Sequence, residues 1–383
     1  MHSRLKVPLK IEEHSYCPIS KRSDLANLLR VTKVLIIDEM SIGHRYVFEC
    51  IDRTLRDIRD TPNELFGGMI VIMAGDWTQI LPVIRHGSKA DVISSTLKHS
   101  YIYRASEKIS FSVNHRAEND PEYAEFLKSV IVGQNLDEDS RITLPPSILF
   151  SNIDHDNDLH SLCRWVFDNI QHNTDPEWLA SRSIICLIND LVKEINLHVM
   201  KQLPGPMHYL LSADRVDENQ HLYPTEFSNS ITASGLPPHI LELKIGSPIM
   251  LIRNLDTVNG HCNGTKYIIK DIKPHVISAS IANGPRQNQH IFIPRIPLIP
   301  SESYFPFHMT RLQFPIKPSF GITSNRSQGQ TLSKVGVYLA EKEFFTHGQL
   351  NVCLSRVQTR SNIKVLRPKE STKTVNIVYK EIL

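Results

Sequence analysis

The chain has 383 residues, which is long enough for two or three domains with a sizeable hydrophobic core. Its net charge of +3, from 43 basic and 40 acidic residues, permits a local nucleic-acid-binding stripe but does not argue for one. No run of about 18 apolar residues occurs, which excludes a transmembrane helix, and no apolar signal sequence follows Met1. The six cysteines are scattered without a Cys-x-x-Cys pair, so free thiols in a reducing compartment are expected.

The first predicted strand is Val34–Ile37, an apolar run that leads directly into Asp38 and Glu39. Such a run is typical of a strand buried on both faces, as in a parallel sheet covered by helices. Two acids at its end need a chemical reason, because an unpaired buried carboxylate is costly. At the carboxyl edge of a parallel sheet, one acid can hold Mg²⁺ and the other can orient a water. Two solvated acids at a strand end explain this stretch, taken alone, equally well.

A second apolar run, residues 69–74, also ends in polar groups, Asp76 and Gln79. Between the two runs, apolar residues recur at the spacing of one helix face, at Val47, Ile51, Leu55 and Ile58. The order strand, helix, strand predicts a right-handed βαβ unit whose polar tips share one edge. This second stretch favours the chemical interpretation of Asp38 and Glu39.

The remaining chain continues the α/β pattern with one interruption. We expect a helix from Pro121, a polar loop over 134–160, a strand at 184–188 and a helix capped by Asn189 and Asp190. Short, closely spaced strands over about 240–310 predict a small antiparallel barrel, and strands near 335–339 and 363–366 flank a helix over about 347–357. A group of potential metal ligands fits no known spacing and is better explained as a solvated helix start: His155, Asp156, Asp158, His160 and Cys163.

Several ordered motifs carry a resemblance to a known family. They are Ile37–Ser41, Gly75–Val83, Asn114–Arg116, Leu243–Leu255 with Cys262–Thr265, Ile322–Thr331 and His347–Arg356. Each is weak alone, but together and in this order they are specific. From His2 to about Leu366, the chain resembles the Pif-type DNA helicases of superfamily 1, in particular the helicase portion of Helitron transposons. By this resemblance, helicase motifs II, III, IV, V and VI are Ile37–Ser41, Gly75–Val83, Asn114–Arg116, Ile322–Thr331 and His347–Arg356, and the Leu243–Leu255 stretch with Cys262–Thr265 is a further Helitron signature.

The resemblance implies an α/β fold with two RecA-like domains of the P-loop ATPase type, the first incomplete, and an SH3-like β-barrel inserted in the second. The implied divisions are 1–110 for the incomplete first domain, 111–206 for the start of the second, 207–312 for the insertion and 313–383 for the remainder. It also implies 5′ to 3′ translocation on single-stranded DNA and unwinding of duplex DNA. Family roles in DNA repair, recombination and telomere maintenance lead us to expect a nuclear location.

The cofactors implied by the resemblance are ATP and Mg²⁺. Asp38 would bind the metal and Glu39 would position the attacking water. Gln79 would sense the γ-phosphate, while Arg116 and Arg356 would act as arginine fingers from the second domain. Further nucleotide contacts are implied within motifs III and V, at Gly75, Asp76, Gln328 and Gly329.

Contacts to the DNA backbone are implied at two places. One is the motif Ib segment, with His2 and Ser3, and the other is motif V, with Thr323, Asn325, Arg326 and Ser327. The barrel would flank the DNA channel, although plain surface decoration is a reasonable alternative. Two positions depart from the family pattern: Arg326 replaces a more frequent lysine, and Asn351 replaces a frequent tyrosine, which we expect to loosen packing.

The family's phosphate-binding loop, Gly-x-x-x-x-Gly-Lys-Ser/Thr, does not occur in these 383 residues. The nearest stretch, Gly260–Lys266, has the wrong spacing and order and is rejected. Without that loop, Asp38 and Glu39 have no held triphosphate, and the βαβ unit should expose apolar surface. We therefore weigh a truncated ATP-dependent helicase against a non-catalytic DNA-binding remnant and against a degenerate product without a stable fold.

Overall fold

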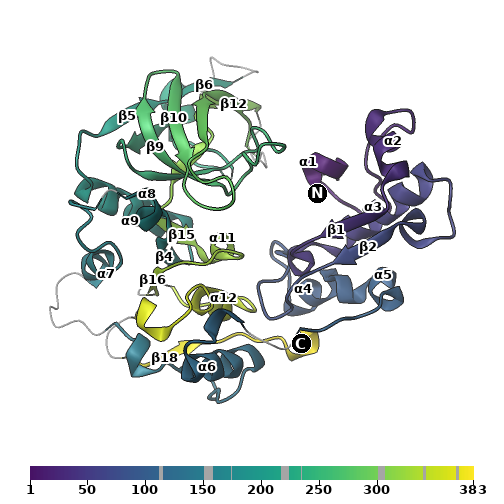
Figure 1. Ribbon diagram of the computed structural model, residues 1–383, viewed down its shortest axis with the longest axis horizontal. Coiled ribbons are helices and arrows are strands. Elements are labelled where there is room, and N and C mark those ends of the chain that lie inside the picture. Colours follow the sequence, from purple (N-terminus) through teal and green to yellow (C-terminus); the bar gives the residue numbers. More distant parts are fainter. Residues whose placement is uncertain are drawn as a thin grey trace.

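The computed structural model describes residues 1–111, 115–150, 158–173, 175–216, 224–233, 235–300, 307–339, 342–367 and 371–383. Figure 1 shows two bodies: residues up to about 105 form one, and the rest of the chain forms the other. The final residues return to the first body, where Ile382 packs with Leu81 and Val92. No helix in the described ranges has the length and apolar character needed to cross a membrane.

The first body is built on the predicted strand–helix–strand unit. β1 (Val34–Ile37) pairs in parallel with β2 (Ile70–Met73), and α3 (Arg45–Ile58) connects them. The four apolar positions predicted for the helix face are buried, because α3 packs them against one side of the strands. The other helices of this body are α1 (His2–Leu5), α2 (Asp24–Val31), α4 (Lys89–Ser95) and α5 (Tyr101–Ala105). The prediction of a parallel pair with both tips at one edge is confirmed.

The two strands are not buried on both faces, so that part of the prediction is wrong. Leu35, Val71 and Met73 pack with the core beside α3, but the side chains that alternate with them point away from it. The alternating side chains are 44–68% exposed: Val34, Ile36, Ile70 and Ile72. The expected exposure of apolar surface on the βαβ unit is thereby confirmed.

The second body contains a four-stranded parallel sheet in the order β15-β4-β16-β17. Its strands are β15 (Gly321–Thr323), β4 (Arg182–Cys186), β16 (Lys334–Tyr338) and β17 (Ile363–Leu366). Its helices are α6 (Pro121–Val132), α7 (Asp158–Val166), α8 (Pro176–Ala180), α9 (Asn189–Gln202), α11 (Ser324–Ser327) and α12 (Gln349–Leu354). One hydrophobic cluster joins α7 and α9 to this sheet, and a second cluster joins α6 and α12 to it. The predicted α/β rhythm is confirmed here, with a shorter final helix than expected.

The region between these elements is antiparallel, as predicted from its short strands. A five-stranded sheet has the order β11-β10-β9-β8-β14, with β8 (Pro248–Leu251), β9 (Lys266–Ile272), β10 (Val276–Ile281), β11 (His290–Pro294) and β14 (Ile316–Pro318). β14 lies beyond residue 312, where the sequence predicted the insertion to end. The division into domains and the SH3-like character of the insertion stay predictions. The smaller sheets pair β12 (Ile296–Leu298) with β13 (Met309–Gln313) and β6 (Ala213–Val216), β5 (His208–Leu211) with β7 (Ile240–Leu243), and β18 (Lys373–Val375) with β3 (Arg141–Thr143).

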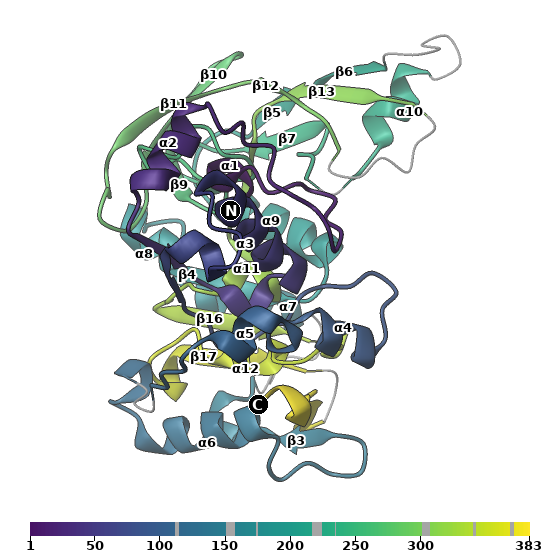
Figure 2. The same cartoon turned by 90° about the vertical axis from the view of Figure 1, so that its right-hand side faces the viewer.

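One part of this region projects from the molecule. Figure 2 shows β6, β13 and α10 (Thr225–Ser230) extending together at one end. Arg311 of β13 holds them together, because its buried guanidinium bonds Asp214 of β6 at 2.6 Å and donates to the Ser228 carbonyl of α10. A buried charge of this kind is tolerated only when it is paired and hydrogen-bonded.

Candidate active site

The carboxylates at the end of β1 stand at a sharp turn of the backbone. Glu39 adopts a left-handed conformation with φ of 55°, which is uncommon for a residue other than glycine. Its amide donates to the Asp38 carboxylate at 2.9 Å, and the next amide, of Met40, donates to the carbonyl of Ala74 at 2.8 Å. Asp38 is exposed and Glu39 is half-buried, so both carboxylates can reach a ligand from solvent.

The end of β2 packs directly against this turn. A side chain at Gly75 would place its Cβ 2.9 Å from Met40 Cγ and 3.0 Å from the Ser41 amide nitrogen. Gly75 is therefore required sterically, and this explains why it follows the second strand. The structure brings the predicted motif II and motif III residues together at one edge.

Asp76 organises the loop that follows Gly75. Its carboxylate accepts from the Thr78 amide and hydroxyl, at 2.8 and 2.7 Å, and from Gln79 Nε2 at 2.9 Å. Gln79 therefore uses its amide nitrogen locally, while its buried Oε1 atom has no hydrogen-bond partner in the described structure. An unsatisfied buried acceptor costs free energy and calls for a donor that is absent from the described residues.

The same loop contacts the second body. His347 Nε2 donates to the Trp77 carbonyl at 2.8 Å, while its Nδ1 accepts from the Tyr379 amide. Asn351 Nδ2 donates to both the carbonyl and the hydroxyl of Thr78, each at 3.0 Å. Asn351 thus reaches the facing body through its amide nitrogen, but its buried Oδ1 has no hydrogen-bond partner among the described residues, and the expected loosening of packing stays a prediction.

Glu39 also contacts the second body. Gln328 Nε2 donates to Glu39 Oε2 at 3.0 Å, across 289 positions of sequence. Gly329 lies beside it, since a Cβ at Gly329 would be 3.5 Å from Glu39 Oε1. Motif V therefore meets motif II in the structure, as their common assignment to a nucleotide site predicts.

The two predicted arginine fingers lie next to each other in the second body. Arg116 donates to the Ser355 carbonyl at 3.1 Å. Arg356 is only 1% exposed, and its guanidinium donates to backbone carbonyls of the same body, among them Val352 at 2.7 Å and Gln330 at 3.2 Å. Burial, then the charge of Arg116, lowers the pKa of Arg356 to about 10, against the opposing influence of Glu39 and Asp76.

The residues predicted to bind DNA differ in their exposure. Asn325 is exposed and Thr323 and Arg326 are half-buried, but Ser327 is fully buried and its hydroxyl donates to the Ser324 carbonyl at 2.7 Å. Burial lowers the pKa of Arg326, whose guanidinium contacts Met250 Sδ at 3.8 Å. Ser327 is therefore a structural residue in this conformation, and direct contact with DNA stays a prediction for the others.

The amino-terminal DNA segment is α1, which faces the second body (Figure 1). His2 Nδ1 bonds the Val7 carbonyl at 2.8 Å, and Arg4 reaches across to the Thr257 carbonyl at 3.2 Å. The side chain of Ser3, and also Asn114 of motif IV, lie outside the described residues. The same is true of His155 and Asp156, two of the potential metal ligands considered from the sequence.

The donor set at the turn suits a hard metal ion that shares its ligands with phosphate. Mg²⁺ binds oxygen and is usually held by one or two carboxylates plus phosphate oxygens. Asp38 is such an exposed oxygen donor, and no cluster of three or more acidic, histidine or cysteine ligands occurs among the described residues. Asp38 thus fits a metal that arrives with a nucleotide.

Three residues of the contact between the bodies were not assigned a role from the sequence: His347, Gly348 and Asn351. Their role in the contact depends on which loop of the first body faces them, and only the tertiary structure shows this. The only sequence signal was their membership of motif VI, where Gly348 stands just before the helix.

Comparison with known proteins agrees with the motif order. Residues 1–134 match the model of the PIF1-like helicase family, and residues 226–272 match the 2B domain of DNA helicase Pif1. The chain is 27% identical over 360 residues to the ATP-dependent DNA helicase PIF1 of Danio rerio, covering 91% of this chain and 49% of the relative. It is 24% identical over 373 residues to the ATP-dependent DNA helicase PIF6 of Trypanosoma brucei brucei, covering 91% and 42%. The chain thus spans about half the length of these relatives.

The fold is also that of solved Pif1 structures. The structure of Bacteroides Pif1 bound to single-stranded DNA superposes with a TM-score of 0.69 at 22% identity, covering all of this chain and 80% of that one. The predicted α/β fold with RecA-like domains is confirmed, whereas the Helitron affiliation stays a prediction. In its ordered motifs, its matches over residues 1–134 and 226–272 and its fold, the chain is similar to the PIF1-like helicases.

Proposed function

We propose that this chain is the motor portion of an ATP-dependent DNA helicase that moves 5′ to 3′ on single-stranded DNA and unwinds duplexes. One observation carries the proposal: Glu39, the predicted water-positioning group, accepts a hydrogen bond from Gln328 of the facing body at 3.0 Å. A ligand that engages Glu39 competes with this bond. Occupation of the nucleotide site is therefore coupled to how the two bodies meet.

Asp38 would hold Mg²⁺, which would neutralise charge on the phosphates and orient them. Glu39 would orient the attacking water, since its carboxylate lies beside Asp38 and is half-exposed. Gln79 would respond to the γ-phosphate by moving its Nε2 donor from Asp76 to a phosphate oxygen, while its Oε1 atom, which lacks a partner among the described residues, would accept from a water. Each of these roles uses a polar atom that the structure places at one edge of the sheet.

Arg356 must move before it can act as a finger. In this conformation its guanidinium donates to the carbonyls of Val352 and Gln330, inside its own body. Reaching a phosphate beside Glu39 requires exchanging those carbonyls for phosphate oxygens, which form stronger, charge-assisted bonds. We propose that ATP binding supplies this exchange and draws the bodies together.

The proposed partners are single-stranded and duplex DNA. α1 and α11 lie on the sides of the two bodies that face each other, which suits a strand passing between them (Figure 1). Asn325 and Arg326 provide donors suited to backbone phosphates. The related Bacteroides structure, which holds single-stranded DNA, supports this proposal.

The test is turnover with and without the water-positioning group. Residues 1–383 contain no Gly-x-x-x-x-Gly-Lys-Ser/Thr loop, so the chain is assayed after fusion to the segment that precedes the matched region in the Danio rerio relative. We expect phosphate release stimulated by single-stranded DNA. Glu39→Gln should retain nucleotide binding and lower turnover by about 10²-fold or more. The matched control is Glu12→Gln, an exposed acid outside the site, which should leave turnover unchanged.

Two other outcomes would contradict the proposed helicase activity or its assignment to motif II. If the fused protein binds single-stranded DNA and nucleotide but Glu39→Gln leaves phosphate release unaltered, the assignment of motif II is wrong. If the fused protein folds and binds DNA without any turnover, the chain is a DNA-binding remnant of a helicase. Circular dichroism of each variant shows whether it is folded.

A further inference from the structure

Two cysteines of the first body face each other away from the candidate active site. Cys17 lies in the extended segment between α1 and α2, and Cys50 lies on α3. Their sulfur atoms are 3.6 Å apart although 33 positions separate them in sequence. They are 6% and 0% exposed, so neither side chain is free to move away.

A short network fixes the two backbones beside each other. Thr54 Oγ1 accepts from the Cys17 amide at 2.9 Å and donates to the Cys50 carbonyl at 2.7 Å. One residue earlier on α3, the Arg53 guanidinium donates to the Ser15 carbonyl from two nitrogens, at 3.2 and 2.9 Å. Forming a bond of about 2.05 Å between the sulfurs requires them to approach by only ~1.5 Å.

The two thiols are chemically unequal. The hydrogen bond from the Cys50 thiol, aided by Thr54 and the charge of Arg53, lowers the pKa of Cys17 to about 7 despite burial. The same hydrogen bond, together with burial, raises the pKa of Cys50. Burial raises the pKa of both Cys163 and Cys186 to about 12. At neutral pH, the pair therefore places a reactive Cys17 thiolate in contact with the Cys50 thiol. Cys163 and Cys186, with their raised pKa values, stay protonated thiols.

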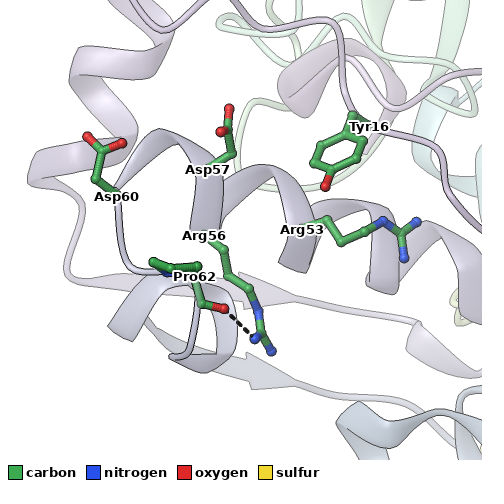
Figure 3. A pocket seen from close by; sticks show the side chains of 6 residues that line it. All are labelled: Tyr16, Arg53, Arg56, Asp57, Asp60 and Pro62. Atoms are coloured by element: carbon green, nitrogen blue, oxygen red, sulfur yellow. Dashed lines mark hydrogen bonds between the residues drawn. The ribbon is translucent and has the colours of Figure 1, made fainter.

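A surface hollow is lined by chain neighbours of the pair, although neither cysteine lines it. It is lined by Tyr16, Arg53, Arg56, Asp57, Asp60 and Pro62, shown in Figure 3. Tyr16 precedes Cys17 in the chain, and the Arg53 guanidinium lies 5.8 Å from its ring centroid. The hollow lies towards the end of α3, from which the chain returns to begin β2, so it is remote from the carboxylates that follow the strands.

We propose that Cys17 and Cys50 form a peroxide-sensitive dithiol that closes to a disulfide. The Cys17 thiolate attacks one oxygen of hydrogen peroxide, the O–O bond breaks, and the departing hydroxide takes a proton to become water. Cys50, after losing its proton, attacks the sulfenic sulfur of Cys17, the S–O bond breaks, and the second hydroxide takes a proton and leaves as water. The dithiol loses two protons and two electrons, and one peroxide is reduced to two waters.

The disulfide would tie the amino-terminal segment to α3. That segment carries α1, whose Arg4 contacts Thr257 of the second body. In the reduced protein, noncovalent contacts such as those of Thr54 and Arg53 hold the segment against α3. Oxidation would make this attachment covalent and so restrict the motion of α1 relative to α3.

The experiment maps the cysteines after oxidation of the intact chain. Reduced protein is treated with hydrogen peroxide, blocked with N-ethylmaleimide and digested with trypsin without reduction. Cys17 falls in the peptide Ile11–Lys21 and Cys50 in Tyr46–Arg53, so their disulfide appears as one linked pair in mass spectrometry. We expect this pair, two hydrogens lighter than the separate peptides, with the other cysteines alkylated.

Three variants separate the steps. Cys50→Ser should stop at a sulfenic acid on Cys17, which dimedone traps, and Cys17→Ser should yield neither the disulfide nor dimedone label on Cys50. Cys262→Ser is the matched control, because Cys262 is the more exposed cysteine, and it should leave the linked pair unchanged. A folded protein, judged by circular dichroism, that forms no Cys17–Cys50 link would overturn the proposal. So would oxidation of Cys262 at a rate equal to or above that of the pair.

Discussion

Gly348→Ala should open the contact between the two bodies. Gly348 has φ of 73°, and a Cβ there would lie 2.5 Å from both the carbonyl carbon and the carbonyl oxygen of Gln79 and 2.8 Å from the Thr78 oxygen. These are backbone atoms, so no side chain can rotate aside to make room. The loop that carries Asp76 and Gln79 must therefore move away from α12.

The magnitude follows from a comparison with another glycine. Gly264 has φ of 93°, and no atom of the described residues lies within 4 Å of the point where its Cβ would stand, so alanine there has only the backbone cost, about 1–2 kcal/mol. Gly348→Ala has the same cost and also separates three hydrogen bonds, from His347 to Trp77 and from Asn351 to Thr78. At roughly 0.5–1.5 kcal/mol for each bond, the loss of all three adds about 1.5–4.5 kcal/mol.

The assay combines stability with shape. Urea unfolding is followed by the fluorescence of the three tryptophans, of which Trp77 lies at the contact, and small-angle X-ray scattering reports the separation of the bodies. We expect Gly348→Ala to lower the unfolding midpoint more than Gly264→Ala and to increase the radius of gyration. Equal midpoints and equal radii for the two variants would refute the steric argument.

Two further predictions concern DNA and pH. Arg326→Ala should weaken binding to a labelled single-stranded oligonucleotide of any sequence, and the slope of log affinity against log salt concentration should become shallower by about 0.7. Asn325→Ala removes no charge and should leave this slope unchanged. If Arg326→Ala lowers stability without changing the slope, Arg326 has only a packing role. Burial lowers the pKa of His347 below its ordinary value of 6.5, so its contribution to stability is complete above about pH 6.5 and is lost as the pH falls through the lowered folded-state pKa. The urea midpoint of His347→Gln should therefore fall less than that of the parent between pH 7.5 and 5.5, and parallel losses would contradict this assignment.

Much of the local structure followed from the sequence because it depends on neighbouring residues. Helical spacing identified the buried face of α3, and apolar runs identified β1 and β2, since both patterns repeat within a few residues. Parallel pairing then placed the groups that follow each strand, Asp38 and Asp76, at one edge. The motif order carried the resemblance to the Pif-type helicases for the same reason, because it lies in the linear sequence.

Tertiary structure decided which faces and atoms are used. Ile36 and Ile72 have the same apolar side chain as the buried isoleucines of the core. They are exposed because no described residues pack over their face of the two strands. The inward-facing guanidinium of Arg356, the bond from Asn351 to Thr78 and the meeting of Cys17 with Cys50 each depend on segments far apart in the chain. Residue patterns encode which side of an element is apolar, but the partner of a polar atom is fixed only when distant elements pack together.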